Sequence, residues 1–315
     1  MASTEGTRAQ WPAHVALGFV QTCFGLFPIF GKRAFSPGGY SPMAVGAWRM
    51  LFGALALSVV ALLLRRSEFR PPRELWGRLI VLGFLGVAAN MTLYLEGLSR
   101  TTAVNTGLMV SLIPVATVTV AMLVGQERFE WQRLLGLALA LFGASLLFWA
   151  EDPELAAKYA LGNSLLALNM LCYAVYLVQV RPLTRAHPPL VVIAWVFLAS
   201  LVWLPLLLVR EWGFGSSTPS LGEWFWPASA SREQLLALVY ILLFPTFFAY
   251  LLNAFALSRV KASTTAVYIY LQPLITAGAA AWLLGEQVRS NALAAAACIF
   301  PGVWIVSRRW RKEPE

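Results

Sequence analysis

Residues 98–127 read LSRTTAVNTGLMVSLIPVATVTVAMLVGQE, and residues 257–286 read LSRVKASTTAVYIYLQPLITAGAAAWLLGE. A constant shift of 159 positions (257 − 98) aligns the two stretches without a gap. Ten of the thirty aligned positions are identical: Leu98/Leu257, Ser99/Ser258, Arg100/Arg259, Ala103/Ala262, Thr106/Thr265, Leu112/Leu271, Pro114/Pro273, Thr117/Thr276, Ala121/Ala280 and Glu127/Glu286. The chain therefore contains an internal repeat, and each copy is long and apolar enough to cross a membrane as a helix.

The composition extends this interpretation to the whole chain. Of the 315 residues, 59% are hydrophobic and 12% are charged, whereas a soluble domain carries roughly 25% charged residues. Backbone groups in lipid must be hydrogen-bonded internally, so apolar blocks of about twenty residues indicate helices. We expect an all-α integral membrane protein with ten transmembrane helices, at 14–31, 43–64, 77–97, 103–124, 132–150, 160–179, 190–209, 234–257, 263–284 and 290–307.

The basic residues indicate how the chain is oriented in the membrane. Most Lys and Arg residues fall in connecting segments that share one side if the N-terminus is cytoplasmic. By the positive-inside rule, this bias predicts that both termini are cytoplasmic. The net charge of +9 is thus accounted for by loops at a lipid bilayer, and we expect no nucleic-acid partner.

The repeat also predicts the organisation of the chain. Each half holds five predicted spans, and an odd number of crossings inverts the second half relative to the first. Inverted repeats of this kind build transport sites near the bilayer midplane. We expect a cytoplasmic tail at 1–13, a five-helix repeat at 14–150, an external linker at 151–159, a second repeat at 160–307 and a basic cytoplasmic tail at 308–315.

Helix-breaking residues occur at matching positions of the two halves. Pro114 and Pro273 lie within predicted spans, and Gly86 and Pro245 correspond at the same shift of 159. A proline inside a helix removes one backbone hydrogen bond. Breaks in corresponding places of two repeats are typical of a transport site, although prolines are also common in membrane helices that only bend.

Neutral polar and aromatic residues gather near these breaks. Those that we expect to face a central cavity and bind substrate are Phe24, Phe27, Asn90, Tyr94, Asn105, Met109, Tyr173, Tyr176, Tyr250, Tyr268 and Gln272. The alternative for each aromatic residue is packing between helices, and for each Asn or Gln it is an interhelical hydrogen bond. A cavity of this kind suits amphipathic solutes such as apolar amino acids and suits polyanions poorly, because a polyanion needs several buried cations.

Charged residues within or next to the spans are candidates for gating or for structural support. Arg49 lies within the second span, and Glu96, near the end of the third, is its expected partner. This pair could form an outer gate or a static clamp between helices. Glu127 and Glu286 end two corresponding spans, where a carboxylate can bind backbone donors at the start of the next helix.

The sequence contains no pattern that indicates an enzyme. Cys23, Cys172 and Cys298 all fall in predicted spans, so neither a disulfide framework nor a metal site is expected. We find no nucleotide-binding loop or catalytic triad, and we expect no cofactor. No aspartate or histidine lies deep in a span, which favours facilitated transport or exchange over proton coupling.

These motifs resemble those of a known family. The Leu-Ser-Arg-x-x-Ala start of the two repeat copies, the Leu-x-Pro at 112–114 and 271–273, and the closing Glu are similar to the EamA type of the drug/metabolite transporter superfamily. Trp48-Arg49 is similar to that family's arginine near the start of the second helix. The resemblance covers residues 14 to 308 and implies a helical bundle around a central cavity and export of amino acids or related metabolites. The first helix departs from the family, because Phe24-Gly25 and Tyr173-Ala174 stand where the family often has Trp-Gly or Trp-Ala.

We therefore expect a permease of a bacterial inner membrane that moves small organic solutes by alternating access. One alternative is a sugar-phosphate or nucleotide-sugar exchanger of the same superfamily, which should show paired Lys or Arg in its cavity. An alternative from another class is a non-transporting membrane scaffold, which would not need matching helix breaks in both halves. Apolar surfaces are expected to face lipid and do not by themselves argue for a dimer.

Overall fold

The computed structural model describes residues 2–126, 131–146, 153–212, 220–257, 268–269 and 271–307. Within these ranges the chain is helical and contains no strand. The described helices of the first half are α1 (Ala2–Ala34), α2 (Pro42–Arg65), α3 (Trp76–Gly83), α4 (Ala89–Arg100), α5 (Ala103–Val110), α6 (Ile113–Leu123) and α7 (Trp131–Leu146). Those of the second half are α8 (Pro153–Ala186), α9 (Pro189–Ser200), α10 (Leu204–Trp212), α11 (Leu221–Phe225), α12 (Arg232–Ile241), α13 (Ala249–Leu257), α15 (Leu271–Leu283) and α16 (Ser290–Ser307).

Seven described helical stretches are long and apolar enough to cross a membrane. They are Trp11–Ala34, Pro42–Glu68, Arg73–Arg100, Ala103–Leu123, Ala157–Ala186, Pro189–Leu208 and Arg232–Asn253. Three shorter apolar helices, at Leu134–Leu146, Leu271–Leu283 and Ser290–Gly302, overlap the other three predicted spans. The all-helical class is thus confirmed for the described residues, and the count of ten spans stays a prediction.

Three segments that were expected to lie outside the spans contain helix. The helix α1 begins at Ala2, within the predicted N-terminal tail, and α8 begins at Pro153, within the predicted linker 151–159. Proline is tolerated in the first turn of a helix, and the following Glu-Leu-Ala-Ala-Lys favours helix. The long segment 210–233 contains α11, whose first turn is closed by a capping box between Ser220 and Glu223.

The expected breaks lie in register in the two halves. The α5 helix ends at Val110 and α6 begins at Ile113, so Pro114 occupies a first-turn position where its missing N–H leaves no hydrogen bond unmade. Pro273 stands near the start of α15 in the same way. Gly86 and Pro245 each lie in a π-helical turn, Phe84–Ala88 between α3 and α4 and Leu242–Phe248 between α12 and α13.

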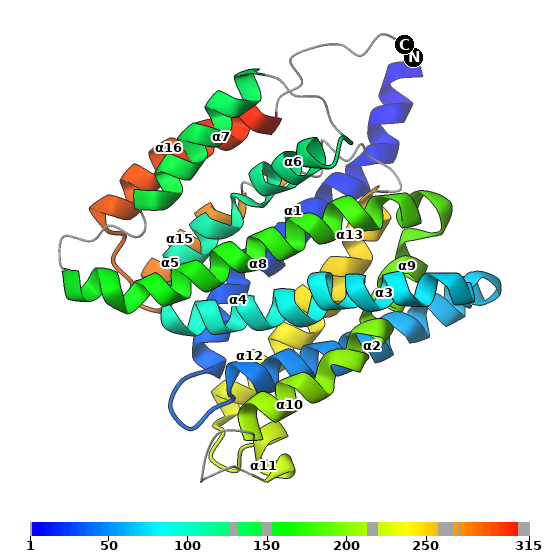
Figure 1. The fold of residues 1–315 in the computed structure, drawn as a ribbon, viewed down its shortest axis with the longest axis horizontal. Helices are drawn as coiled ribbons and strands as arrows, with labels where there is room; N and C mark the ends of the chain where they lie inside the picture. Colours follow the sequence, from blue (N-terminus) through cyan, green and yellow to red (C-terminus); the bar gives the residue numbers. More distant parts are fainter. Residues whose placement is uncertain are drawn as a thin grey trace.

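The helices pack side by side (Figure 1), and two of the seams between the halves correspond to each other in the repeat. One seam is formed by α1 of the first half with α15 of the second half, and the other by α8 of the second half with α5 and α6 of the first. The α7 and α16 helices pair with each other along one edge of the bundle (Figure 1). The two seams place α1 and α8, the first helix of each repeat, against the broken helix of the opposite repeat.

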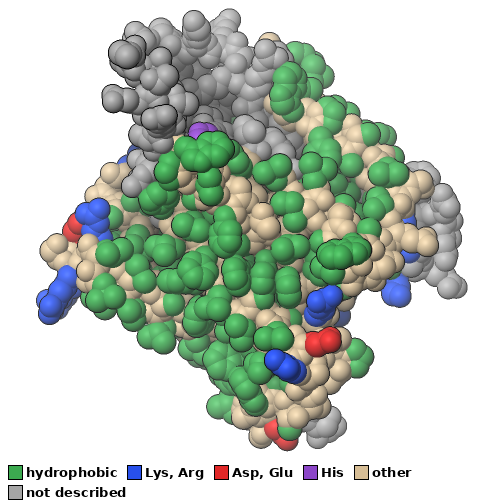
Figure 2. All heavy atoms as spheres, turned by 180° about the vertical axis from the view of Figure 1, so that it is seen from behind, with side chains coloured by type: hydrophobic (Ala, Val, Ile, Leu, Met, Phe, Trp, Pro, Cys, Tyr) green, Lys and Arg blue, Asp and Glu red, His purple; other side chains and the backbone are tan. Residues whose placement is uncertain are grey.

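The surface is that of a protein embedded in lipid. Large apolar side chains such as Leu63, Leu123 and Trp282 are exposed. Figure 2 shows a face on which hydrophobic side chains dominate, with charged side chains mostly towards its margins. Such extended apolar surface is costly in water and is expected of a membrane-embedded bundle.

Candidate functional site

A buried arginine lies among aromatic residues between the two halves. Arg49 of α2 is 4% exposed, and its guanidinium carbon stands 4.5 Å from the centre of the Phe27 ring of α1. Its Nε donates a hydrogen bond of 2.9 Å to Thr246 Oγ1. Tyr94 and Tyr250 are its electrostatic neighbours. The guanidinium is thus held by a ring and a hydroxyl from opposite halves of the chain.

The expected pairing of Arg49 with Glu96 is wrong. Glu96 Oε2 accepts a hydrogen bond of 2.5 Å from Arg100 Nη2, one turn further along α4. Residues four apart on a helix meet without any adjustment of neighbouring elements, so the local partner is the one that binds. Among the described residues no carboxylate lies within ion-pair distance of Arg49. A buried charge without a counter-ion is costly, and the contacts of Arg49 with the Thr246 hydroxyl and the Phe27 ring offset part of this cost.

Six of the predicted substrate-binding residues form the aromatic cluster around Arg49. They are Phe24, Phe27, Tyr94, Tyr173, Tyr176 and Tyr250. Phe27 and Tyr94 stack with centroids 4.8 Å apart, and Tyr173 and Tyr176 stack at 5.7 Å. Tyr250 contacts Phe24 edge-on at 6.5 Å and lies within electrostatic range of Tyr173 and Tyr176. The cluster draws on α1, α4, α8 and α13, so it spans both halves.

The two π-helical turns shape this cluster. A Cβ atom added to Gly86 would lie 2.4 Å from the Tyr176 ring, so only glycine lets the tyrosine approach the turn. Thr246 follows Pro245 in the other turn and donates to the carbonyl of Ile241, five residues earlier, while accepting from Arg49. Thr246 was missed by the sequence reasoning, and its position directly after the matched helix breaker is the signal that could have found it.

The predicted site residues Gln272 and Tyr268 lie along the seam between α1 and the start of α15. Three hydrogen bonds between described residues cross this seam: Gln272 Nε2 to Gln21 Oε1 (2.5 Å), Tyr268 OH with His14 Nδ1 (2.9 Å), and Thr276 Oγ1 to the Gly25 carbonyl (2.7 Å). Gln21 and Gln272 are both buried. The side chains of Gln272 and Tyr268 are thus engaged in joining the halves.

The remaining predicted site residues are spread over α4 and α5. Met109 is buried in the same hydrophobic cluster as Phe27 and Tyr94. Asn105 is buried nearer the start of α5, where its amide donates to Thr101 Oγ1. The backbone carbonyl of Asn90 accepts a hydrogen bond of 2.7 Å from Asn169 of α8. None of these three contacts Arg49 in the structure, and their role in substrate binding stays a prediction.

Glu286 binds a helix start, but not that of the next helix in the sequence. Its two carboxylate oxygens accept hydrogen bonds from the backbone N–H groups of Ala103 (3.0 Å) and Val104 (3.2 Å), at the start of α5. A carboxylate there satisfies free backbone donors and complements the helix dipole. Glu286 therefore connects the two repeats. Its counterpart Glu127 lies outside the described residues.

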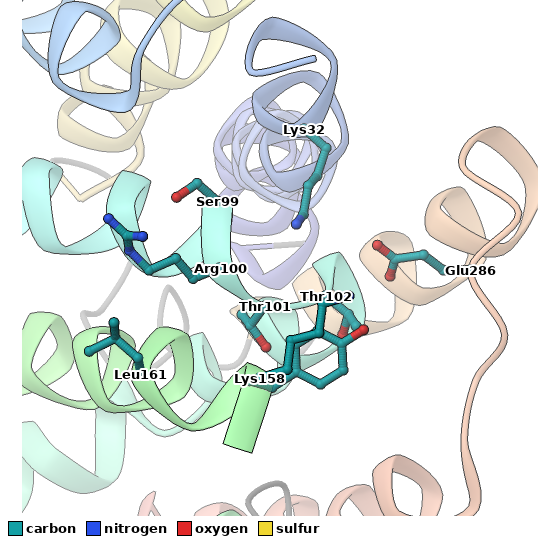
Figure 3. Close-up of a pocket in the computed structure, with 9 residues that line it drawn as sticks. Lys32, Ser99, Arg100, Thr101, Thr102, Lys158, Leu161 and Glu286 are labelled. Carbon is teal, nitrogen blue, oxygen red and sulfur yellow. The ribbon is translucent and has the colours of Figure 1, made fainter. Parts of the chain in front are cut away.

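A cavity of about 450 Å³ lies beside Glu286. It is lined by Lys32, Ser99, Arg100, Thr101, Thr102, Lys158, Tyr159, Leu161 and Glu286. Figure 3 shows Lys32 and Glu286 reaching into this space from different elements, while Arg100 points away from it. None of the eleven predicted substrate-binding residues lines this cavity.

The comparisons with known proteins agree with the membrane architecture. The model of the EamA-like transporter family matches residues 12–149 and again residues 160–308. A solved crystal structure of a protein matches with a TM-score of 0.60 over 95% of this chain and 96% of its own, at 20% identity. This likeness concerns the fold alone.

Several relatives are named as transporters. A "probable terminal-alkyne amino-acid exporter" of Streptantibioticus cattleyicolor is 26% identical over 273 residues, which cover 86% of each chain. An uncharacterized transporter of Archaeoglobus fulgidus is 22% identical over 94% of this chain and 98% of its own. The uncharacterized transporter YyaM of Bacillus subtilis is 22% identical over 78% of each chain. The resemblance seen in the sequence is thus confirmed, and the chain, a multi-pass membrane protein, belongs to the EamA-like transporter family.

Proposed function

We propose that this transporter exports or exchanges small organic solutes that carry a carboxylate and an apolar body, such as apolar amino acids. The buried guanidinium of Arg49, without a described carboxylate partner and set against Phe27, is the observation that carries the proposal. Arginine binds a carboxylate through two parallel N–H donors, which gives both strength and orientation. The aromatic cluster would receive the apolar part of the same solute.

The number of buried cations supports a monoanionic or zwitterionic solute over a phosphorylated one. Arg49 is the one Lys or Arg side chain that is buried among those described. A sugar phosphate carries about two negative charges and would call for several buried cations. The relative named as an amino-acid exporter supports the same choice.

The proposed mechanism is alternating access between the inverted repeats 14–150 and 160–307. Arg49 and Phe27 belong to the first repeat, whereas Thr246 and Tyr250 belong to the second, so the cluster stands where the halves meet. Inverted-repeat transporters rock one part against another around such a site. We propose ten membrane crossings with both termini in the cytoplasm, in the inner membrane of a bacterium.

The test is counterflow into proteoliposomes that contain the purified protein. Labelled amino acids, amines, sugars and sugar phosphates are offered in turn, with and without a pH gradient. The proposal predicts accumulation of an apolar amino acid without a gradient, and little accumulation of the matching amine. Thermal unfolding of the same preparation shows whether it is folded.

Two outcomes would contradict the proposal. Accumulation of a phosphorylated solute alone would favour the exchanger of the same superfamily. A folded preparation that shows no counterflow with any solute of the panel would favour a scaffold that does not transport.

A further inference from the structure

We infer that the cavity beside Glu286 is a second, outer binding site for the carboxylate of the transported solute. The inference rests on the proposed function, because it names a waiting position for the same solute. The cavity, of about 450 Å³, falls in the range of small-molecule sites, roughly 300–1,000 Å³. It is formed where α1, α4 and α8 end or begin.

The acidic groups of this region are already engaged. Glu286 accepts two hydrogen bonds from the backbone at the start of α5. Glu96, just behind the cavity on α4, pairs with Arg100, so this cation of the lining is neutralised. The start of α5 is likewise occupied by Glu286 and is not offered to a ligand.

The two lysines that line the cavity differ from Arg100, which is paired with Glu96. Neither Lys32 nor Lys158 has a carboxylate of a described residue within 4.0 Å, although Glu286, which also lines the cavity, is an electrostatic neighbour of Lys32. Lys158 Nζ lies 5.9 Å from the centre of the Tyr159 ring, and the guanidinium carbon of Arg289 lies 5.5 Å from the same ring. Lys32, Lys158 and Arg289 thus give this region more basic than acidic side chains, even with the carboxylate of Glu286 in the lining. Ammonium groups bind a carboxylate as point charges, each with three donors.

The hydroxyl groups of the lining leave the ammonium groups as the main donors to a ligand. Thr101 Oγ1 donates to Asn163 Oδ1 at 2.7 Å, and Ser99 Oγ donates to the carbonyl of Glu96 at 2.8 Å. Thr102 Oγ1 accepts from the backbone N–H of Asn105 at 3.0 Å, which leaves its own O–H able to donate. Recognition of a carboxylate at this position would thus combine the charge of the ammonium groups with one neutral donor.

We place the cavity on the route that a solute would take from the Arg49 cluster. Lys32 follows Phe27 by five residues on α1, and Ser99 follows Tyr94 by five on α4, which is about 8 Å along each helix. Phe27 and Tyr94 stack on each other with centroids 4.8 Å apart, and Arg49 contacts the Phe27 ring, so the cavity lies about 8 Å along the two helices from the Arg49 cluster. A solute that leaves Arg49 along this route would meet the two lysines, which would hold its carboxylate before release.

The test is lysine footprinting on the full-length protein, and it does not require transport. An amine-reactive ester labels the chain, and mass spectrometry gives the rate at each of its lysines, which are Lys32, Lys158, Lys261 and Lys312. Hexanoate is the probe, hexanamide is its neutral isostere, and inorganic phosphate and chloride are the competing anions. Lys261 and Lys312 serve as internal references, since the charge pattern predicts them on the opposite side of the membrane.

We expect hexanoate at about ten times its dissociation constant to slow labelling of Lys32 and Lys158 roughly tenfold, by mass action. Hexanamide and chloride should leave both rates unchanged. In Lys32→Gln the protection of Lys158 should be lost, and in Lys32→Arg it should be kept. Arg232→Gln is the matched control, because Arg232 is exposed at the start of α12, whose Gln234 contacts Ser36 just beyond α1.

Three results would overturn the inference. These are no protection by hexanoate, equal protection by hexanamide, or stronger protection by phosphate, which would make the cavity a phosphate site. Counterflow of an amino acid together with unprotected lysines would remove the outer site and leave the proposed function standing. Protection by hexanoate without counterflow would support the site and contradict the function.

Discussion

Two of the seams between the repeats, α1–α15 and α8–α6, are related by the internal symmetry but differ in chemistry. In the α1–α15 seam, Gln21 and Gln272 are hydrogen-bonded to each other. The first helices of the two repeats align at a shift of 149, at which Cys23-Phe24 corresponds to Cys172-Tyr173. At the shifts of 149 and 159, the counterparts of the two glutamines in the α8–α6 seam are Met170 (21 + 149) and Ile113 (272 − 159), which pack in an apolar cluster. A buried hydrogen bond fixes one alignment of two helices, whereas apolar contacts tolerate several.

The seams also differ in how closely the helices can approach. Gly25 of α1 corresponds to Ala174 of α8 (25 + 149). A Cβ atom on Gly25 would lie 2.8 Å from Ile275 Cβ and 3.2 Å from the Gln272 carbonyl oxygen, whereas Ala174 carries its Cβ within the packed core. We infer that the two repeats rock about the α1–α15 seam, which stays closely packed, and that they slide past each other at the α8–α6 seam.

The largest loss of stability is expected when a methyl group is added at Gly25. Gly25→Ala overpacks the α1–α15 seam and should lower the free energy of unfolding by about 1–3 kcal/mol, measured by thermal unfolding in detergent. Gly18→Ala on the same helix is the control, because no atom lies within 4 Å of its added Cβ. Equal unfolding temperatures of Gly25→Ala and Gly18→Ala would mean that the α1–α15 seam is not close-packed.

The second-largest loss of stability is expected when the hydrogen bond between Gln21 and Gln272 is removed. Gln272→Leu leaves the buried Gln21 amide without this partner, and should cost about 1 kcal/mol. The single Gln272→Ile should show the same loss, and the double variant Gln21→Met/Gln272→Ile, which copies the residues of the α8–α6 seam, should recover most of it. Thermal unfolding of Gln21→Met, Gln272→Ile and the double variant gives the coupling between the residues. Additive losses would show that the pair does not act as a unit.

A smaller effect is expected at Thr276. Its hydroxyl donates across the seam to the Gly25 carbonyl, whereas the hydroxyl of its counterpart Thr117 donates to Ile113 of its own helix. Thr276→Val should therefore cost about 0.6 kcal/mol, the average for interhelical hydrogen bonds in membranes. Thr117→Val should cost less. A larger loss of stability in Thr117→Val than in Thr276→Val would mean that the α8–α6 seam, and not the α1–α15 seam, is held more firmly.

The smallest effect on stability is expected at the end of the seam. Tyr268→Phe removes one hydrogen bond with the partly buried His14 and keeps the ring, so thermal unfolding should change by only a few tenths of a kcal/mol. Tyr268→Ala removes the ring as well and should slow counterflow while the protein remains folded. Counterflow at the normal rate in Tyr268→Ala would remove this residue from the transport path.

Much of the architecture could be predicted from the repeat. The shift of 159 placed Gly86 and Pro245 at equivalent positions, and the structure has a π-helical turn at each. A repeat carries such features twice, so each copy supports the other. The family could be predicted for the same reason, because its motifs occur in both halves.

The partners of the charged residues could not be predicted from spacing. Glu96 was expected to meet Arg49, but Arg100 lies four residues away on the same helix and is the nearer partner. Lys32 and Lys158 are 126 positions apart (158 − 32), and the sequence predicts only that each lies in a connecting segment. Only the packing of α1 against the other half brings them to one cavity.

The central claim, that Arg49 binds the carboxylate of the solute, is tested most directly by comparing a substrate with its amide. Counterflow is measured for the amino acid that the transporter accepts best and for its C-terminal amide, in the natural protein, in Arg49→Gln and in Arg65→Gln. Arg65 is the matched control, because it ends the same helix and is exposed. The natural protein and Arg65→Gln should prefer the acid by about tenfold or more, as expected for a charge-assisted hydrogen bond of about 1.5–3 kcal/mol. Arg49→Gln should show no preference, and a preference that persists in this variant would contradict the claim.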